Sequence, residues 1–286
     1  MYSNETLKEF FIKPKIFKYV SSGTYGKIYT DGKLIYKKVV CKTSEDITNL
    51  FNEINIQNEV YKTRQKSRES FKKMAIVPKI LNVLKTKNPS IFYIIMENGG
   101  ESFYKSFKKN KINLRESLMI MYQLLELLNF LQKKIKFSHR DLHLDNILIS
   151  KSNLKNAYGD PFYYVSLIDF GFSRLQKGKK IISSHLYFNS DTYTPYFDIG
   201  FMIYDFFNHL LNCHFTDSEN YKCKYKVPDN LIRFIVEIIK STGVHFESIY
   251  SRNNLYDLLH NTQPIQPKNL NIKRIQKILL KLLKTL

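Results

Sequence analysis

The feature that most constrains the fold is a change in hydrophobic spacing at NGG, residues 98–100. Before it, short segments rich in β-branched and aromatic residues predict strands: IFKYVSS, GKIYT, KLIYKKVV and IFYIIME. One segment among them, 44–66, has apolar residues at helical spacing and predicts a helix with Ser44 or Asp46 as its N-cap. After NGG, helical spacing dominates, first in a long amphipathic helix over 114–135. Strands followed by helices predict an α+β fold in two lobes.

Turn signals refine this division. We place the boundary between the lobes at NGG, which gives a first lobe of residues 1–97 and a second lobe of residues 98–286. Asp-Gly at 31–32 predicts a two-residue hairpin turn between two strands. NILIS and YVSLIDF predict two short strands in the second lobe, and the pattern from residue 196 onward is mainly helical to the terminus.

Composition and charge narrow the class of protein. Hydrophobic residues make up 43% and aromatic residues 14%, which is typical of a globular chain. The first residues are polar and charged, unlike a signal peptide, and no apolar run is long enough to span a bilayer. We therefore expect a soluble, intracellular protein of the cytoplasm.

The chain is strongly basic, with 45 Lys+Arg against 25 Asp+Glu and a net charge of +20. Such a balance favours polyanionic partners: nucleic acid, acidic protein segments or anionic membrane. The lysine-rich segments KSFKKNKINLR and KGKK are the candidate contacts, and the scarcity of arginine speaks against base-specific reading of nucleic acid. AT-rich coding would give the same composition, so a functional and a compositional origin of the charge both stay open.

Three polar residues lie at the ends of short apolar strands predicted in the second lobe. HRDLHLDN contributes Asp141 and Asn146, and LIDFG contributes Asp169. Oxygen ligands of this kind suit Mg²⁺, which prefers one or two carboxylates together with substrate phosphates. An aspartate beside a metal-bound phosphate can also accept the proton of an attacking hydroxyl. These residues predict phosphoryl transfer.

A phosphate-binding loop and a cation are expected in the first lobe. SSGTYGKIY lies between two predicted strands, and small residues such as Gly23 and Gly26 let a backbone approach phosphates closely. The next strand offers Lys37 and Lys38, of which only one can face a cleft because side chains alternate along a strand. We choose Lys37, because that choice puts Ile35 on the same face as an apolar floor.

A lysine in a cleft needs an anionic partner. The predicted helix over 44–66 offers Glu53 and Glu59. We choose Glu53, because the apolar positions that follow it fit the inward face of the helix.

This ordered set of motifs resembles the eukaryotic-type protein kinase fold over about residues 17–210. The set comprises a glycine loop, a strand lysine, a helix glutamate, the hinge IIMEN, HRDLHLDN and DFG, of which the last two are specific when they occur together. The resemblance implies an ATP-binding first lobe and a catalytic, substrate-binding second lobe. It also implies ATP with Mg²⁺, or Mn²⁺ in its place, as cofactors, and a serine or threonine of a protein as the acceptor.

The resemblance implies a role for single residues. Asp141 would accept the proton of the substrate hydroxyl, and Asn146 and Asp169 would bind the metal. Lys37, paired with Glu53, would hold the α- and β-phosphates. Further nucleotide contacts are implied for Ser21, Gly23 and Gly26 over the phosphates, Ile28 and Ile35 against the adenine, Met96 at the back pocket, and the backbones of Glu97 and Gly99 at the adenine edge. Asp198 resembles the helix aspartate that supports the catalytic loop.

His143 departs from the common pattern, because most serine/threonine kinases have a lysine there. A histidine at this position resembles haspin-like kinases, divergent kinases of large DNA viruses, and small-molecule kinases of the aminoglycoside and choline type. A viral origin would place the protein in a host cell or a virion. We expect His143 to take part in catalysis by hydrogen-bonding the γ-phosphate or the acceptor. The alternative is a structural histidine that bonds the nearby backbone.

Two other segments depart from the pattern. The gap between Asn146 and Asp169 is longer than usual, which predicts an inserted surface loop at 151–164. The activation segment FSRLQKGKKIISSHLYFNSDTYTPYFD has no APE, which predicts a reshaped substrate-docking segment. Within it, the candidate phosphorylation sites that Arg140 could contact are Ser183, Ser184, Thr192 and Thr194.

Two other functions stay open. A small-molecule kinase of the choline or aminoglycoside type is favoured by His143. It is opposed by Arg140 and the complete DFG, because those families usually put a small or polar residue before the aspartate and vary the third motif. A pseudokinase that acts as an interaction scaffold is opposed by the complete set of catalytic residues.

Overall fold

The structure is a computed structural model that covers both the strand-rich and the helix-rich part of the chain. It describes residues 17–23, 26–67, 75–86, 90–155, 161–184, 197–211, 213–215, 221–224, 229, 231–233 and 272–285.

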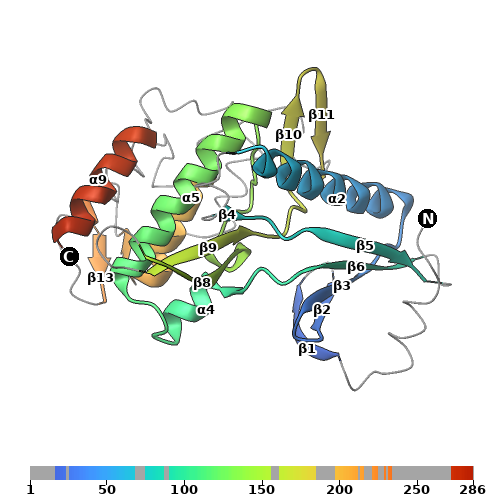
Figure 1. The fold of residues 1–286 in the computed structure, drawn as a ribbon, viewed down its shortest axis with the longest axis horizontal. Coiled ribbons are helices and arrows are strands. Elements are labelled where there is room, and N and C mark those ends of the chain that lie inside the picture. The colour runs from blue at the N-terminus through green and yellow to red at the C-terminus, as the bar shows by residue number, and fades with distance from the viewer. Residues whose placement is uncertain are drawn as a thin grey trace.

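The first part of the chain forms a five-stranded antiparallel sheet with one helix, α2 (Ser44–Gln65) (Figure 1). The strand order is β1-β2-β3-β6-β5, so β3 is at the centre. The bounds are β1 (Lys18–Gly23), β2 (Gly26–Thr30), β3 (Leu34–Val40), β5 (Ile80–Lys85) and β6 (Ile91–Glu97). The four strands and the helix predicted from hydrophobic spacing are therefore confirmed, and β5 is an additional strand at the edge of the sheet.

Alternation along β3 decides which side chains face α2. Val39 packs with Leu50 and Ile54 of the helix, whereas Tyr36 packs with Tyr93 in a separate cluster on the other side of the sheet. Because successive side chains of a strand point to opposite faces, odd-numbered residues of β3 point toward α2. This phase sets the direction of every functional side chain on the strand.

The N-cap of α2 is Thr43, so the prediction of Ser44 or Asp46 was wrong. The Thr43 hydroxyl accepts a hydrogen bond from Asp46 N at 3.1 Å, and the Asp46 carboxylate accepts one from Thr43 N at 2.9 Å. This capping box satisfies two amide groups at the helix start reciprocally, which neither predicted cap would do.

The turn between β2 and β3 has three residues between the strands rather than the predicted two. β2 ends at Thr30, β3 begins at Leu34, and Gly32 has φ +94°. The Asp31 carboxylate accepts hydrogen bonds from the backbone N–H groups of Lys33 at 2.8 Å and Leu34 at 2.7 Å. These two bonds stabilise the longer turn.

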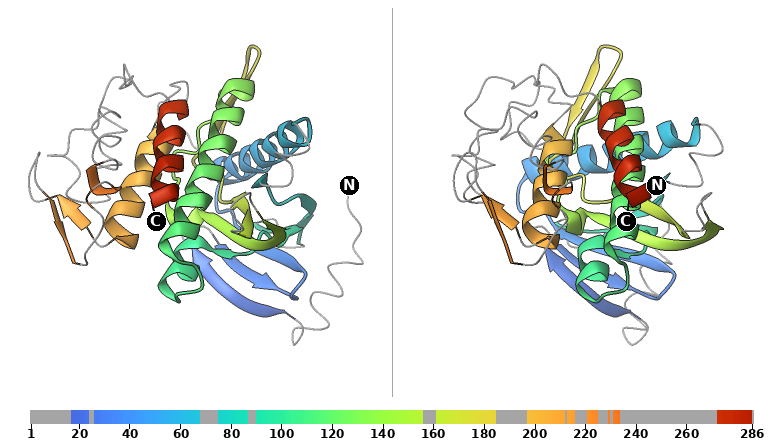
Figure 2. Two further views of the ribbon diagram at one scale, coloured as in Figure 1. Left: turned by 60° about the vertical axis from the view of Figure 1, so that its left-hand side comes forward. Right: turned by 90° about the vertical axis from the view of Figure 1, so that its left-hand side faces the viewer.

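The second part of the chain is built on α5 (Leu114–Ile135), whose leucines form the centre of the main hydrophobic core. C-terminal helix α9 (Ile272–Thr285) lies along α5 (Figure 2). A four-stranded sheet in the order β4-β9-β8-β7 packs near α5. Its strands are β4 (Ala75–Ile76), β7 (Glu101–Ser102), β8 (Ile147–Lys155) and β9 (Pro161–Leu167). The remaining described elements are α4 (Phe103–Lys108), η1 (Leu144–Asn146), β10 (Arg174–Lys177), β11 (Lys180–Ser183), α6 (Phe197–Asp205), η2 (Phe206–Leu210), β12 (Cys213–Phe215) and β13 (Tyr221–Cys223).

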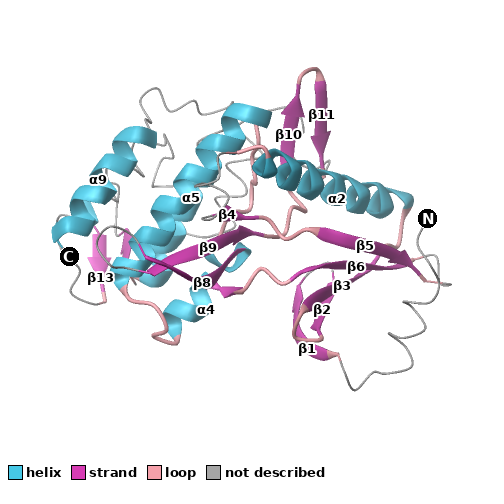
Figure 3. Cartoon of the chain, in the orientation of Figure 1, coloured by secondary structure: helices cyan, strands magenta, loops and turns pink. Residues whose placement is uncertain are grey.

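One prediction for the second part needs correction (Figure 3). Much of the expected inserted loop at 151–164 is strand, because β8 continues to Lys155 and β9 begins at Pro161. Within the part expected to be mainly helical, β12 and β13 pair as an antiparallel hairpin.

Glycine occupies positions where the chain passes close to other backbone. Gly100 has φ +112°, and a Cβ there would collide with the carbonyl oxygen of Ile149. NGG thus lets the chain pass against β8 on leaving β6. The lobe boundary between residues 97 and 98 remains a prediction. Within the part of the chain that the structure describes, no helix is both long and apolar enough to cross a bilayer.

Candidate active site

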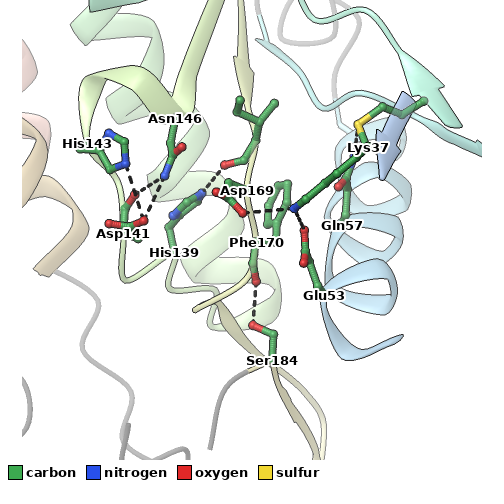
Figure 4. A network of polar contacts seen from close by, with 12 residues as sticks. Lys37, Glu53, Gln57, His139, Asp141, His143, Asn146, Asp169, Phe170 and Ser184 are labelled. Carbon is green, nitrogen blue, oxygen red and sulfur yellow. Dashed lines mark hydrogen bonds and ion pairs between the residues drawn. The ribbon is translucent and has the colours of Figure 1, made fainter. Parts of the chain in front are cut away.

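An ion pair joins the central strand to α2. Lys37 Nζ lies 2.7 Å from Glu53 Oε1 and 3.4 Å from Asp169 Oδ1 (Figure 4). Lys37 is in the same phase of β3 as Val39, which explains why its side chain reaches the helix. Glu59, the other candidate partner, instead contacts Lys177 of β10 at 2.8 Å.

The pKa values of the pair reflect its burial, since each side chain is only 13% exposed. Burial acts to lower the pKa of Lys37, but the negative charges of Asp169 and Glu53 outweigh it and hold the pKa above its ordinary value. Burial raises the pKa of Glu53 above 4.5, although Lys37 acts against this shift. Lys37 is therefore a fixed cation beside two carboxylates.

Asp141 and Asn146 are joined directly on the loop between α5 and β8. The Asn146 amide donates to the Asp141 carbonyl at 2.9 Å and to Asp141 Oδ2 at 3.2 Å. His143 Nε2 lies 3.6 Å from the same carboxylate oxygen, so it forms an ion pair with Asp141 when it is protonated. Of the three residues that the sequence singled out on this loop, Asn146 and His143 thus both lie beside the carboxylate of Asp141 (Figure 4).

One side-chain contact and one backbone hydrogen bond connect this loop to the segment that carries Asp169. His139 Nε2 lies 2.9 Å from the Ile168 carbonyl, and Ile168 N donates to the Asn146 carbonyl at 3.1 Å. Asp169 itself has φ +62°, a left-handed conformation that is uncommon outside glycine and that often occurs at functional sites.

Asp198 of α6 supports the loop from the interior, as its resemblance to a supporting aspartate implied. Its two carboxylate oxygens accept hydrogen bonds from His139 N and Arg140 N, both at 2.7 Å. Arg140 has φ +67°, and these bonds stabilise that conformation. Burial raises the pKa of Asp198, while His139 and the two N–H groups act in the opposite direction.

The residues expected around an adenine lie on the sheet near α2. Met96 is 9% exposed and is paired across the strands with Ile35, which packs on the same cluster. Ile28 is opposite Lys37 in the register of β2 and β3 and is therefore on the same face. Ile28, Ile35 and Met96 thus place apolar side chains beside Lys37, which is compatible with a base but does not test the predicted contact.

The hinge residues have tight surroundings. The Glu97 side chain accepts a hydrogen bond from Lys79 N at 3.0 Å, and Glu97 N donates to the Lys79 carbonyl at 3.0 Å. A Cβ on Gly99 would lie 3.0 Å from a methyl group of Leu148, so a larger residue would press on β8. Their predicted contacts with the adenine edge remain predictions.

The glycine loop is described only at its two ends. Ser21 pairs with Ile28 and Gly23 with Gly26, while residues 24–25 lie outside the described part. A Cβ on Gly26 would collide with the carbonyl oxygen of Lys38, so the close approach of β2 and β3 requires glycine there. The expected contact of Ser21, Gly23 and Gly26 with phosphates remains a prediction.

The activation segment begins as a hairpin of β10 and β11. Ser184, just after β11, is buried, and its hydroxyl donates to the Phe170 carbonyl at 2.7 Å. Ser184 is therefore not available to carry a phosphate for Arg140 in this structure. Ser183 is partly exposed, whereas Thr192 and Thr194 lie outside the described residues.

Sequence reasoning missed two buried polar residues at the site. Gln57, 4% exposed and one helical turn after Glu53, donates to the Pro78 carbonyl at 2.8 Å and lies 4.0 Å from Met96 Sδ. Asp205 accepts a hydrogen bond from Leu144 N at 2.7 Å. Two features of the sequence could have indicated these residues. Gln57 is a polar residue on the apolar face of α2, and Asp205 is a second aspartate two helical turns after Asp198.

The donor set fits a nucleotide with a divalent metal. Asp169 is 47% exposed at its side chain and presents a carboxylate beside Lys37. The Asn146 amide hydrogens point at Asp141, so its amide oxygen is the atom that can bind a cation. Oxygen ligands of this kind suit a hard cation that is also held by phosphates.

Comparison with known proteins agrees with this geometry. The chain matches the family described as "Haspin like kinase domain" over residues 18–277. It is 30% identical over 188 residues to a putative serine/threonine-protein kinase of Acanthamoeba polyphaga mimivirus, which covers 62% of this chain and 29% of the relative. It is 29% identical over 153 residues to the serine/threonine-protein kinase haspin homologue of Saccharomyces cerevisiae, which covers 52% and 18%. A probable serine/threonine-protein kinase of Dictyostelium discoideum is 32% identical over 117 residues, which is 39% of this chain and 18% of the relative.

The chain spans less than a third of the length of each of these relatives. The family match, in contrast, extends from β1 into α9. It confirms the predicted resemblance and the two-lobed α+β class. The chain therefore belongs to the haspin-like kinase domain family.

Proposed function

We propose that this chain is a serine/threonine protein kinase that transfers the γ-phosphoryl group of ATP to a hydroxyl of a protein. The observation that carries the proposal is the arrangement of two sets of side chains. Asp141 and Asn146 are hydrogen-bonded on one side of the site, and the Lys37–Glu53–Asp169 contacts are on the other (Figure 4). Family membership and the names of the relatives support the same reaction.

Each residue then has a defined task. A bound divalent metal, for which we propose Mg²⁺ before Mn²⁺, would neutralise charge on the phosphates and would be held by Asn146 and Asp169. Lys37 would bind phosphate oxygens, and Glu53 would orient it. Asp141, 7% exposed, would orient the acceptor hydroxyl and take its proton.

One measurement tests the reaction class. Purified protein would be incubated with labelled Mg-ATP and a panel of casein, basic protein and amino alcohols. Label on serine or threonine of a protein is the expected result. Label on amino alcohols alone would instead establish the second candidate, a small-molecule kinase, which His143 favours. ATP binding without transfer to any acceptor would favour the scaffold alternative.

The basic surface has a smaller role in this proposal. Two lysines of KSFKKNKINLR contact the carboxylate of Glu101: Lys109 at 3.4 Å and Lys111 at 2.6 Å. In KGKK, Lys177 contacts Glu59. Part of the positive charge of both segments is therefore neutralised within the chain. We propose acidic protein substrates before nucleic acid as the partners of the lysines that remain exposed, because the proposed acceptor is a protein.

We expect His143→Ala to lower kcat by about 10- to 100-fold and to leave the KM for ATP nearly unchanged. The reason is the loss of a hydrogen bond to a charged group in the transition state, which is worth about 1.5–3 kcal/mol. Steady-state kinetics over a range of ATP concentrations checks this expectation. His143→Gln, which keeps a side-chain donor, should retain more of the rate. An unchanged kcat in His143→Ala would leave only the structural role for this histidine.

A further inference from the structure

Helix α6 carries two aspartates, Asp198 and Asp205, at its two ends. They are seven residues apart, which is close to two turns of an α-helix, so they lie on the same face. Both accept hydrogen bonds from the backbone of the loop that contains Asp141. Asp198 bonds the two N–H groups that precede Asp141, and Asp205 bonds one N–H group that follows it.

The bond from Asp205 is made at the start of a short turn. Leu144 is the first residue of η1, the 3₁₀ turn that ends at Asn146, and its side chain is fully buried. The first N–H groups of such a turn have no acceptor within the turn itself. His143 is at the N-cap position, but within the described structure its side chain makes no capping bond. Asp205 supplies the missing acceptor from a different helix, at 2.7 Å.

Asp205 is itself held in place. It is 9% exposed, and its second oxygen lies 3.3 Å from Nε2 of His209, one turn further along in η2. The ring of His209 in turn meets the ring of Tyr104 of α4 edge-on, with 6.1 Å between centroids. One carboxylate oxygen of Asp205 therefore bonds Leu144 N on the loop, and the other lies near the ring of His209 in η2.

The position of the Asn146 side chain depends on this turn. Asn146 N donates to the His143 carbonyl at 2.9 Å, which closes η1, and its amide then reaches Asp141. A buried N–H group that loses its acceptor is costly, so the loss of the Asp205 carboxylate would favour a shift of this three-residue turn. Asp141 precedes η1 and is fixed from its other side by the bonds of Asp198.

We propose that Asp205 is a positioning residue for Asn146: through Leu144 N it fixes the turn that presents the Asn146 amide oxygen to the metal. This inference rests on the proposed role of Asn146 in binding metal-ATP. It predicts that replacing Asp205 weakens Mg²⁺ binding more than it slows proton transfer to Asp141.

The test compares ATP binding with and without Mg²⁺ by titration calorimetry, together with the Mg²⁺ dependence of phosphoryl transfer. Residues that orient a metal ligand typically change metal affinity by about 10- to 100-fold when they are replaced. We therefore expect Asp205→Ala to raise the Mg²⁺ concentration for half-maximal rate by roughly tenfold. Its ATP affinity without metal should stay within about twofold of the wild type. Asn208→Ala, on the same segment, is the matched control and should behave like the wild type.

Asp205→Asn provides a second variant if the alanine variant does not fold, because the amide keeps one acceptor oxygen for Leu144 N, although it loses the charge and replaces the other oxygen with an NH₂ group. It should show a smaller change in the same direction. An unchanged Mg²⁺ dependence in either variant would overturn the inference, and so would an equal loss of ATP affinity with and without metal, which indicates general disruption. A wild-type protein that binds no Mg-ATP would instead overturn the proposed function, on which the inference rests.

Discussion

Asp141→Asn is expected to lower kcat by about 10²- to 10⁴-fold, because the variant has no group at this position that can accept the proton of the substrate hydroxyl. The amide is nearly the same size as the carboxylate. Its oxygen can still accept the hydrogen bond that Asn146 makes to Asp141 Oδ2 at 3.2 Å, and the bond to the Asp141 carbonyl is untouched. The loop should therefore keep its shape, and the KM for ATP should change little. Steady-state kinetics with saturating metal measures both quantities.

Asp145→Asn is the matched control for this change. Asp145 is exposed on the same loop, and its carboxylate accepts a hydrogen bond from Ser102 Oγ at 2.8 Å, which an asparagine oxygen can also accept. This variant should keep most of the activity. If Asp141→Asn were as active as Asp145→Asn, the base would have to be another group, and the assignment of Asp141 would be wrong.

Lys37→Met is expected to reduce phosphoryl transfer by at least about 100-fold and also to destabilise the fold. The activity falls because the variant has no ammonium group at position 37 to bind the phosphate oxygens of ATP. The stability falls because Glu53, 13% exposed at its side chain, keeps a charge without its partner. Breaking a buried ion pair costs about 3–5 kcal/mol, which corresponds to a fall in Tm of roughly 6–15 °C for a domain of this size.

The loss of stability in Lys37→Met should depend on pH. Burial raises the pKa of Glu53 above its ordinary value of 4.5, and removing Lys37 takes away the charge that acts against this shift. A group whose pKa is raised in the folded state contributes stability below its unfolded pKa and loses that contribution as the pH rises through the folded pKa. The difference in Tm between wild type and variant should therefore be small near pH 4.5 and grow toward pH 8.

Lys38→Met is the matched control for Lys37→Met. Lys38 is the next residue of β3, so its side chain points to the opposite face of the sheet, away from Glu53. We expect its Tm to stay within about 2 °C of the wild type, because changes outside such contacts usually cost less than about 0.5 kcal/mol. A fall in Tm for Lys37→Met that is the same at every pH would contradict the buried pair as its cause.

Much of the site could be predicted because its signals are local in the sequence. Side chains alternate along KLIYKKVV, and Lys37 was chosen over Lys38 because it shares a face with the apolar Ile35. Glu53 was chosen over Glu59 because the apolar residues that follow it fit the inward face of the helix. The structure places Lys37 and Glu53 2.7 Å apart. The roles of these residues in binding ATP are still proposals that the experiments above test.

Other parts could not be predicted because they depend on partners far away in the chain. Asp205 is remote in sequence from Leu144, and Gln57 bonds a carbonyl that reaches it only when β5 and α2 pack together. The availability of Ser184 was misjudged for the same reason, since its hydroxyl is occupied by the carbonyl of Phe170. In each case the deciding hydrogen bond joins two segments that hydrophobic spacing treats separately.

The sequence by itself predicted four strands and the helix of the first part, the phase of β3 and the pairing of Lys37 with Glu53, because periodicity and motif order are properties of short segments. Only the tertiary structure decided which buried polar groups support the candidate site. Burial removes water as a partner, so the N–H groups of His139, Arg140 and Leu144 need acceptors from another element. Two carboxylates of one helix, Asp198 and Asp205, meet that need, and they do so only after the chain has folded.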